Sequence, residues 1–461
     1  MDISRLLQEL RTFLNQGQVI TDRENMSHFC YDATEQRFMP DVVVQPANTE
    51  QVSRAMKAAY DLGIPVTPQG GRTGLSGGAL PVRGGVLLSL IRMNRIVEVD
   101  EKNLQVVVEP GVISFDLQKE VNKYGLFFPP DPSSTVESTI GGNVAENAGY
   151  TRAVKYGVTR DYILGLEVVL PDGEIVNVGG RTVKNVVGYD LVALITGSEG
   201  TLGVITKVFF KLMPRPRFRD TVIIYFDDIM KAADVVQGIF KSGIVPSAIE
   251  LMDNLSISAV AEHMTTELDA SAAALVLVEV DGNHRDAVRV EAESIRDIAQ
   301  KTGGTTTAWV ADEKDAERFW LWRRETLPSL KAMGKDHLEA DVVVPRYALP
   351  SLIKTIQDLC EGKKVRIANF GHAGDGNLHV TIMYRKRNFE ETLEANELLE
   401  EIYRQTVAMN GRLTGEHGVG ITAMPFMSLQ LKPAEIALMK RIKAAFDPKG
   451  LLNPGKIFPD E

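Results

Sequence analysis

The sequence predicts an α+β protein with two main domains. The chain has 461 residues, which is more than one hydrophobic core normally serves. Short runs rich in valine, isoleucine and leucine alternate with helical stretches on both sides of residues 213–220. That segment, MPRPRFRD, carries two prolines and three arginines, which is typical of a domain link. We therefore expect a mixed domain on each side of it.

The composition excludes several classes of protein. The chain is 44% hydrophobic and 24% charged, and its net charge of −10 makes nucleic acid and anionic membranes unfavourable partners. Cys30 and Cys360 are the only cysteines, too few for a disulfide framework, a cysteine zinc site or an iron–sulfur cluster, so a cytoplasmic location is expected. No apolar run approaches about 18 residues, and the charged N-terminus lacks a signal-peptide core.

The elements of the first half follow from hydrophobic periodicity. Residues 1–35 are expected to be largely helical, and a helix at 49–63 has a threonine N-cap and a terminal glycine. The remaining predicted elements are strands at 41–46, 64–69, 86–90, 96–100, 105–110 and 203–212, a helix at 111–126 and a hairpin at 164–178 around Pro171-Asp172-Gly173.

The second half shows the same alternation. The sequence predicts strands at 221–226 and 273–282, a helix ending at 243 and another at 284–302. A terminal segment at 446–458 is rich in turn residues. We therefore expect a second α+β domain after the link.

Glycine-dense loops suggest a binding site in the first half. PQGGRTGLSGG at 68–78 follows a predicted strand and carries five glycines, and a second dense stretch spans 129–149. Such loops let backbone N–H groups turn inward and cradle anionic oxygens, although a flexible surface loop is the alternative. Two of them, with a similar stretch at 197–206, suggest a long ligand with a pyrophosphate, that is, a dinucleotide cofactor.

Residues 450–456 resemble a phosphate-binding loop without being one. They spell G-x-x-x-x-G-K, but Ile457 stands where a magnesium-binding serine or threonine is needed. No strand is predicted before the segment and no helix after it. The sequence therefore argues against nucleotide hydrolysis there.

GHAGDGNLH at 371–379 raises the question of a metal site. Asp375-Gly376 between two apolar runs predicts a two-residue hairpin turn with strands at 364–370 and 378–384. With that turn, His372 lies opposite His379, and opposed Cβ atoms are about 4.5–5.5 Å apart. The pair could share a cation or be two surface histidines, and this stretch alone leaves both possibilities open.

Taken together and in order, these motifs resemble those of the FAD-dependent D-2-hydroxyacid dehydrogenases. This branch of the vanillyl-alcohol oxidase and p-cresol methylhydroxylase superfamily includes D-lactate dehydrogenases, D-2-hydroxyglutarate dehydrogenases and the flavin subunit of glycolate oxidase. The resemblance covers residues 20–458 and rests on PQGGRTGLSGG, PPDPSS, IGGNVAENAGY, GSEGTLGVIT, GHAGDGNLH, GEHGVG and FDPKGLLNPGKIF. It implies a two-part FAD-binding domain of the p-cresol methylhydroxylase type and an α+β substrate (cap) domain with an antiparallel sheet. The implied divisions are 1–35, a helical segment; 36–215, the FAD-binding domain; 216–415, the cap domain; and 416–461, a segment returning to the FAD site.

The resemblance also implies which residues hold FAD. The loop at 70–76 would bind the pyrophosphate. The stretch at 68–78 contains no histidine or cysteine for covalent attachment, so noncovalent FAD is expected. Tyr150 departs from the small residue common at that place in relatives. The implied cofactor residues are Pro68, Gly70, Gly71, Arg72, Thr73, Gly74, Ser76, Pro130, Asp131, Ser133, Ser134, Gly141, Gly142, Asn143, Asn147, Gly149, Ile205 and Asn453.

The same resemblance assigns the reacting groups. His372, His379 and Glu416 match the family's metal ligands, and two imidazoles with a carboxylate suit zinc, iron or manganese. His417 is expected to be the general base, because histidine exchanges a proton near neutral pH. Arg323 is expected to clamp the substrate carboxylate.

The substrate expected from these residues is a small D-2-hydroxyacid, D-lactate or glycolate. Relatives that act on 2-hydroxyglutarate carry a lysine where this chain reads Glu339-Ala340-Asp341-Val342. D-2-hydroxyglutarate remains an alternative substrate. A flavin subunit that needs an iron–sulfur or electron-transfer flavoprotein partner, and a homodimer, are the alternatives for assembly. A metal-dependent hydrolase built on His372, His379 and Glu416 is a third reading, but it leaves the glycine motifs unexplained.

Overall fold

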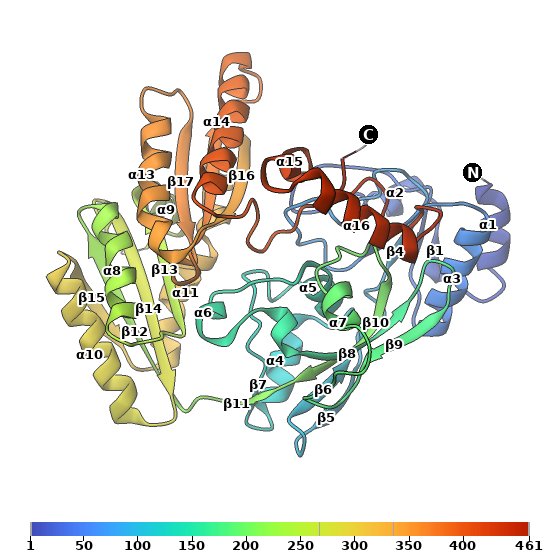
Figure 1. Cartoon of the computed structure of the whole chain (residues 1–461), viewed down its shortest axis with the longest axis horizontal. Helices are drawn as coiled ribbons and strands as arrows, with labels where there is room; N and C mark the ends of the chain where they lie inside the picture. Colours follow the sequence, from blue (N-terminus) through green and yellow to red (C-terminus); the bar gives the residue numbers. More distant parts are fainter. Residues whose placement is uncertain (1, 267, 335, 460–461) are drawn as a thin grey trace. The chain divides into compact units, whose positions relative to one another are not determined.

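The computed structural model describes residues 2–266, 268–334 and 336–459, which form two compact units (Figure 1). Unit 1 comprises Met1–Gly149, Val158–Arg215 and Glu416–Glu461, and unit 2 comprises Tyr150–Gly157 and Pro216–Gly415. Both units mix helices and strands. Among the described residues, no helix combines the length and the apolar character needed to cross a membrane.

Unit 1 contains one mostly parallel sheet and one antiparallel sheet. The first has the order β1 (Val19–Ile20), β2 (Val42–Val44), β4 (Val86–Ser89), β3 (Val66–Gln69), and only β1 is antiparallel to its neighbour. The second has the order β5 (Ile96–Asp100), β6 (Gln105–Val108), β10 (Val204–Lys211), β8 (Ile163–Val169), β9 (Ile175–Gly179), with all pairs antiparallel. The predicted hairpin around Asp172-Gly173 is confirmed as the β8–β9 pair.

The N-terminal residues belong to the core of unit 1. Leu6 and Leu10 of α1 (Ile3–Leu10) are fully buried against α3 (Thr49–Asp61) and the valines of β2. The predicted threonine N-cap of α3 is wrong by one residue: Asn48 is the cap, and its side chain accepts a hydrogen bond from the Gln51 amide. An asparagine carbonyl meets this need as well as a hydroxyl does.

Further helices of unit 1 lie between its strands and after them. They are α2 (Arg23–Met26), α4 (Ser114–Asn122), α5 (Ile140–Glu146), α7 (Leu191–Ile195), α15 (Met427–Gln430) and α16 (Pro433–Phe446), with 3-10 turns at Gln16–Gln18, Thr159–Tyr162 and Met424–Phe426. A two-stranded ribbon joins β7 (Leu126–Phe127) to β11 (Met213–Pro214).

The C-terminal segment returns to the parallel sheet. Leu452 forms a bridge with Val66, and the Asn453 amide donates to the Val66 carbonyl at 2.7 Å. The buried Lys456 donates to the carbonyl of Leu80 at 2.5 Å and to Oδ1 of Asn453 at 3.2 Å. The lysine of the G-x-x-x-x-G-K stretch is therefore a structural tie within unit 1.

Unit 2 is built on one seven-stranded antiparallel sheet. Its order is β15 (Thr305–Val310), β12 (Phe218–Phe226), β14 (Ala274–Gly282), β13 (Ala248–Asp253), β17 (Arg366–Gly371), β18 (Asn377–Tyr384), β16 (Asp336–Val343). The proline-rich stretch at 213–220 is mostly strand, since only residues 215–217 separate β11 from β12. The helices are α6 (Ala153–Tyr156), α8 (Ile229–Lys241), α9 (Asn254–Met264), α10 (Arg285–Lys301), α11 (Glu313–Arg324), α12 (Thr326–Ala332), α13 (Leu349–Cys360) and α14 (Phe389–Ala408), with 3-10 turns at Arg346–Ala348 and Ala373–Asp375.

The two faces of this sheet pack against different helices. Alternate residues such as Ile223, Leu277 and Met252 share one core with apolar residues of α9, α11 and α12. The residues between them point to the other face, which α8 and α10 cover along β12 and β14 (Figure 1). We call the face that carries Met252 the α11 face.

The GHAGDGNLH hairpin has a different register from the one predicted. His379 pairs with Phe370, two residues before His372, because the turn is a longer 3-10 turn over Ala373–Asp375. Gly376 ends this turn with φ +75°, and a Cβ there would lie 2.2 Å from the Val344 carbonyl oxygen, so glycine is required. A shift of two residues preserves the side-chain face of each strand, so the histidines still meet.

Buried ion pairs attach α6 to the sheet of unit 2. Arg152 donates to both carboxylate oxygens of Glu279, at 2.8 and 3.0 Å. Lys155 and Tyr156 both donate to Asp281, each at 2.6 Å. Burial opposes ionisation of Glu279, but Arg152 and Arg219 outweigh it and lower the pKa of Glu279 to about 2.

We predict that Arg152→Met destabilises the protein by roughly 3 kcal/mol at pH 7, because it leaves the buried Glu279 carboxylate without its closest cation. The exposed Arg289, paired with Glu293 on α10, provides the control, and Arg289→Met should change stability by less than about 0.5 kcal/mol. Urea unfolding measures both effects. The pKa of Glu279 in the folded protein lies below its ordinary value of 4.5. The difference in unfolding free energy between wild type and Arg152→Met should therefore become smaller as the pH falls from 4.5 toward 2. A difference in unfolding free energy that does not change with pH would contradict the stabilising role of the Arg152–Glu279 pair.

Candidate active site

A buried carboxylate organises a polar cluster on the α11 face of unit 2. Glu250 of β13 accepts a hydrogen bond from Nε of Arg323, at the end of α11, at 2.6 Å. Its other oxygen lies 2.6 Å from Nδ1 of His372, just beyond β17. All three side chains are almost completely buried. Three separate elements therefore converge on one glutamate.

The second histidine has a carboxylate partner of its own. Nδ1 of His379 lies 3.3 Å from Oδ1 of Asp341, the residue paired with it on β16. The Asp341 carboxylate accepts hydrogen bonds from Asn377 Nδ2, Thr414 Oγ1 and the Gly415 amide, at 2.8 to 2.9 Å. The rings of His372 and His379 lie at 85° to one another with centroids 5.3 Å apart. Each imidazole thus has a carboxylate at Nδ1.

Arg323 has unused hydrogen-bonding capacity in this buried place. Its Nε is bonded to Glu250 and its guanidinium lies 4.9 Å from the centroid of the Phe370 ring. Among the described residues, its buried Nη2 has no hydrogen-bond partner. Such a group is costly unless it meets an acceptor, and a carboxylate ligand would supply one.

In unit 1, the glycine loops pack too closely for side chains. A Cβ at Gly70 would lie 2.3 Å from Oγ1 of Thr139, and one at Gly71 would lie 2.4 Å from the Glu137 carbonyl oxygen. Gly74, in contrast, has open space where its Cβ would be. The loop at 68–78 thus packs directly on the second glycine-rich stretch, as expected of two loops that share a ligand.

Buried hydroxyl groups at these loops lack partners. In the part of the chain that the structure describes, Oγ of Ser76, Oγ1 of Thr139 and Oγ1 of Thr196 are buried without a hydrogen-bond partner. Ser76 and Thr139 belong to the two glycine-rich stretches. Buried hydroxyl groups without a hydrogen-bond partner, next to closely packed glycine backbone, suit a ligand that is rich in acceptor oxygens, such as a pyrophosphate.

Several of the other expected cofactor residues have structural partners. Asn143 of α5 donates to Oγ of Ser114 at 2.8 Å, and Oδ1 of Asn147 accepts from the Arg160 amide at 2.9 Å. Arg72 donates to the carbonyl of His28 and lies over the rings of Phe29 and Tyr31.

The remaining expected cofactor residues lie in strands, loops and helix starts of unit 1. Asn453 is buried and donates to the carbonyls of Gly78 and Glu199 at 2.9 and 2.8 Å, so it joins two of the loops. The others are Pro68 in β3, Ile205 in β10, Thr73 in the 68–78 loop, Pro130, Asp131, Ser133 and Ser134 in the loop before α5, Gly141 and Gly142 at its start, and Gly149 after it.

Two buried acids hold the GEHGVG loop in unit 1. Glu199 accepts hydrogen bonds from the amides of Val419 and Gly420 at 2.8 and 2.7 Å. Gly418 has φ +81°, which favours glycine, and a Cβ there would lie 2.1 Å from Oε2 of Glu146. Burial raises the pKa of both glutamates, and the charge of Glu199 raises that of Glu146 further. This loop carries Glu416 and His417, and Oε2 of Glu416 lies 2.4 Å from where a Cβ on Gly149 would be.

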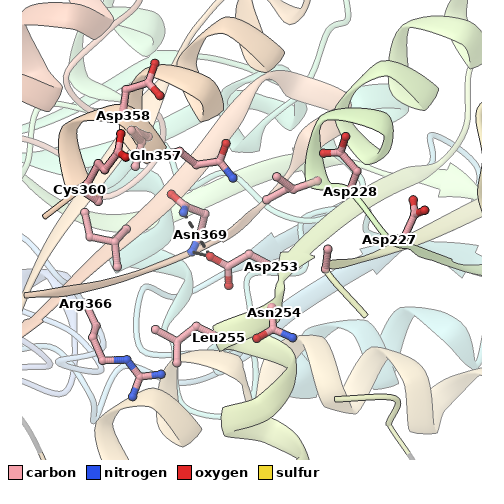
Figure 2. A pocket seen from close by; sticks show the side chains of 15 residues that line it. Asp227, Asp228, Asp253, Asn254, Leu255, Gln357, Asp358, Cys360, Arg366 and Asn369 are labelled. Atoms are coloured by element: carbon pink, nitrogen blue, oxygen red, sulfur yellow. Dashed lines mark hydrogen bonds between the residues drawn. The ribbon is translucent and has the colours of Figure 1, made fainter. Parts of the chain in front are cut away.

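A cavity in unit 2 lies away from the cluster around Glu250. It measures about 770 Å³ and lies among the starts of α8 and α9, the end of α13 and β17 (Figure 2). Asp253 and Asn369, which bond to one another there, lie on the opposite side of the strands from Glu250 and Phe370. The cavity is lined by the acids Asp227, Asp228, Asp253, Asp358 and Glu361. Such a lining does not suit an anionic hydroxyacid.

Three acidic residues of these clusters were not predicted from the sequence: Glu250, Asp341 as a partner of His379, and Glu199. Each is an acidic residue inside a largely apolar or glycine-rich stretch: AIELMD, EADVVV and GSEGTL. A charge in a run that should be buried is the signal that could have identified them.

Comparisons with known proteins identify the two halves. Residues 40–179 match the family described as "FAD binding domain", and residues 215–457 match "FAD linked oxidases, C-terminal domain". The chain is 41% identical to the glycolate oxidase subunit GlcD of Bacillus subtilis, over 93% of this chain and 92% of that one. It is 36% identical to a D-lactate dehydrogenase of Anaerostipes hadrus, over 91% and 89% of the two chains.

Solved structures agree on the fold. The 4-ethylphenol oxidase of Gulosibacter chungangensis superposes with a TM-score of 0.81 over 99% of this chain and 98% of that one, at 21% identity. A p-cresol methylhydroxylase gives 0.80 over 99% and 97%. The two-part FAD-binding fold and the antiparallel sheet of the second domain are thereby confirmed. The chain belongs to the FAD-linked oxidases, a family of flavin-dependent oxidoreductases.

Proposed function

We propose that this protein oxidises a small D-2-hydroxyacid, D-lactate or glycolate, to the 2-oxoacid. The observation that carries the proposal is the buried cluster in which Arg323 offers an unmet N–H beside two histidines, each with a carboxylate partner. The relatives named glycolate oxidase subunit and D-lactate dehydrogenase support the choice of substrate.

Arg323 is proposed to bind the substrate carboxylate. Its Nε bond to Glu250 fixes the plane of the guanidinium, and Nη2 is the donor left for a ligand. A guanidinium matches a carboxylate in shape and charge, and burial strengthens the attraction because little water screens it.

His372 and His379 are proposed to hold a divalent metal together with Glu416. A histidine that binds a metal commonly gives its other ring N–H to a carboxylate, and Glu250 and Asp341 stand at the Nδ1 atoms. The donor set of two imidazoles and a carboxylate suits zinc, iron or manganese. Such a metal acts as a Lewis acid on substrate oxygens.

Glu416 follows directly on residues that are tied to this cluster. Thr414 and Gly415 both donate to Asp341, and Glu416 is the next residue along the chain. The next residue again, His417, is proposed to take the proton of the substrate hydroxyl as general base.

The unit 1 loops are proposed to hold noncovalent FAD through Ser76, Thr139 and the backbone around Gly70, Gly71 and Gly74. Thr139 was not among the residues expected from the sequence. Bound FAD supplies the hydride acceptor for the hydrogen on the substrate Cα. The protein contributes the orientation of the substrate and the removal of its hydroxyl proton.

Glu339 is proposed to favour a substrate with one carboxylate. It lies two residues before Asp341 on β16 and opposite Thr381, so its side chain shares the α11 face with His379. Its buried Oε1 lies 3.6 Å from Nε2 of His337. A second carboxylate on the substrate would approach this acid and be repelled.

A flavin subunit that works only within a complex is the second candidate function. Two relatives, from Bacillus subtilis and Escherichia coli, are named as subunits of glycolate oxidase. This chain has two cysteines, both free, and no iron–sulfur ligand set among them, so a partner would supply the onward electron carrier. Turnover with an artificial acceptor but not with oxygen favours this candidate.

We predict that anaerobic D-lactate or glycolate bleaches the visible band of the purified FAD-loaded protein near about 450 nm. L-Lactate should not bleach this band, because its opposite configuration at Cα directs the Cα hydrogen away from the flavin. D-2-Hydroxyglutarate should reduce the flavin at least about 10-fold more slowly, because repulsion by Glu339 of about 1.4 kcal/mol corresponds to that factor. Comparable reduction by D-2-hydroxyglutarate would contradict the monocarboxylate assignment, and no bleaching by any of these acids would contradict the reaction class.

We predict that His417→Gln slows flavin reduction by about 10²- to 10⁴-fold while leaving the FAD spectrum intact, since a general base contributes about that much. Stopped-flow absorbance with D-lactate measures the rate. His263→Gln, an exposed change on α9, is the control and should react like wild type. If His417→Gln reduces the flavin at a rate within about threefold of the control, His417 is not the general base.

We predict that Arg323→Lys raises KM for D-lactate by about 10- to 100-fold, since a charged hydrogen bond is worth about 1.5–3 kcal/mol and lysine lacks the planar fork. Steady-state kinetics with an artificial acceptor provide the measurement. Arg318→Lys, an exposed position on the same helix, is the matched control. An unchanged KM would show that another cation binds the carboxylate.

A further inference from the structure

Glu250 connects the proposed substrate clamp to a proposed metal ligand. Its side chain is fully buried, and its two oxygens contact different partners: Oε2 contacts Nε of Arg323 and Oε1 contacts Nδ1 of His372, both at 2.6 Å. The pairing of β13 with β17 places Glu250 at this point. Leu251 pairs with Gly371 and Met252 pairs with Phe370, so the next position in the same register brings Glu250 opposite His372.

The contact with His372 selects one form of the imidazole ring. An ionised carboxylate only accepts hydrogen bonds, so the proton of His372 belongs on Nδ1. Nε2 is then the ring nitrogen with the lone pair that a metal needs. A neutral amide at position 250 would remove this selection, because its NH₂ group can donate to Nδ1 and move the ring proton to Nε2.

The contact with Arg323 fixes the other group. With Nε held by Glu250, the guanidinium cannot rotate about its long axis without breaking a buried charged bond. The Phe370 ring, 4.9 Å from the guanidinium carbon, closes one side. The direction in which Nη2 points is therefore set by the same carboxylate that orients His372.

We propose that Glu250 is a positioning residue that fixes Arg323 and His372 together, so that one buried carboxylate sets both substrate binding and metal binding. This inference rests on the function proposed above. It assigns Glu250 no contact with substrate.

The test measures zinc affinity in the absence of turnover. Wild type and Glu250→Gln, both FAD-loaded and stripped of metal by a chelator, are titrated with zinc chloride in a calorimeter. We expect Glu250→Gln to bind zinc about 10- to 100-fold more weakly, which is the usual loss when a metal-bound histidine loses its carboxylate partner. Its KM for D-lactate should rise as well, while its flavin spectrum stays unchanged.

Glu279→Gln is the matched control. Glu279 lies on the neighbouring strand β14, on the same α11 face, and is likewise buried and paired with an arginine. It contacts Arg152 and Ser247 instead of the histidines. Its replacement should lower stability but keep zinc affinity within about twofold of wild type. Equal zinc affinities for Glu250→Gln and Glu279→Gln would overturn the proposal.

A double variant keeps the test decisive if Glu250→Gln does not fold. Glu250→Gln with Arg323→Gln removes both buried charges, which is tolerated better than leaving one alone. The loss of zinc affinity should persist in it, because His372 still lacks its carboxylate, and normal zinc affinity in the double variant would overturn the proposal. Absence of zinc binding in wild type would overturn the proposed metal site itself and this inference with it.

Discussion

A charge that is sealed from water must be neutralised by its neighbours, and this requirement at Glu250 shapes unit 2. Arg323 and His372 meet it from α11 and from the end of β17, 73 and 122 residues away in the chain. Only two residue pairs join β13 to β17, yet they fix which residue faces Glu250. A slip of one residue would turn Glu250 to the opposite face and leave Arg323 buried without a counter-charge. The register of this short ladder is therefore tied to the site.

The α11 face serves as both core and site. Apolar residues such as Met252, Leu277 and Phe319 fill it toward α9, α11 and α12. Toward β18 and β16 the same face carries His379 and Asp341, and Asp341 is satisfied by Asn377 and by Thr414 and Gly415. Glu250, Asp341 and His379 stand on strands of the sheet, and both carboxylates are held by several buried contacts, so these groups have fixed positions. This rigidity is what a site needs in order to hold a small substrate in one orientation.

The sequence predicted features that depend on neighbouring residues and missed those that depend on distant ones. The β8–β9 hairpin is set by Asp172 and Gly173 within the turn itself, so its prediction is confirmed. The register at His379 was wrong because the turn length depends on packing of Gly376 against Val344, which lies on another strand's end. The FAD-linked family was recognisable because seven motifs stand in order, each local. The partners of Glu250 could not be predicted, because nothing near AIELMD in the chain shows that a histidine and an arginine contact this acid.

The GEHGVG loop shows how unit 1 solves a related problem of buried charge. Glu146 and Glu199 face the loop around Gly418, and both are removed from water together with Asp32 and Lys456. One lysine cannot neutralise three acids, and burial lowers the pKa of Lys456 itself to about 8. Glu199 keeps two amide donors, from Val419 and Gly420, that favour its ionised form, whereas Oε2 of Glu146 has no hydrogen-bond partner among the described residues. A proton on Glu146, whose pKa is raised by burial and by the charge of Glu199, would reduce this excess of negative charge. Glu199 then remains the acceptor that holds the backbone at Val419 and Gly420, shortly after His417. A Cβ at Gly418 would meet both carboxyl groups, and one at Gly420 would lie 2.1 Å from the Ser76 carbonyl oxygen.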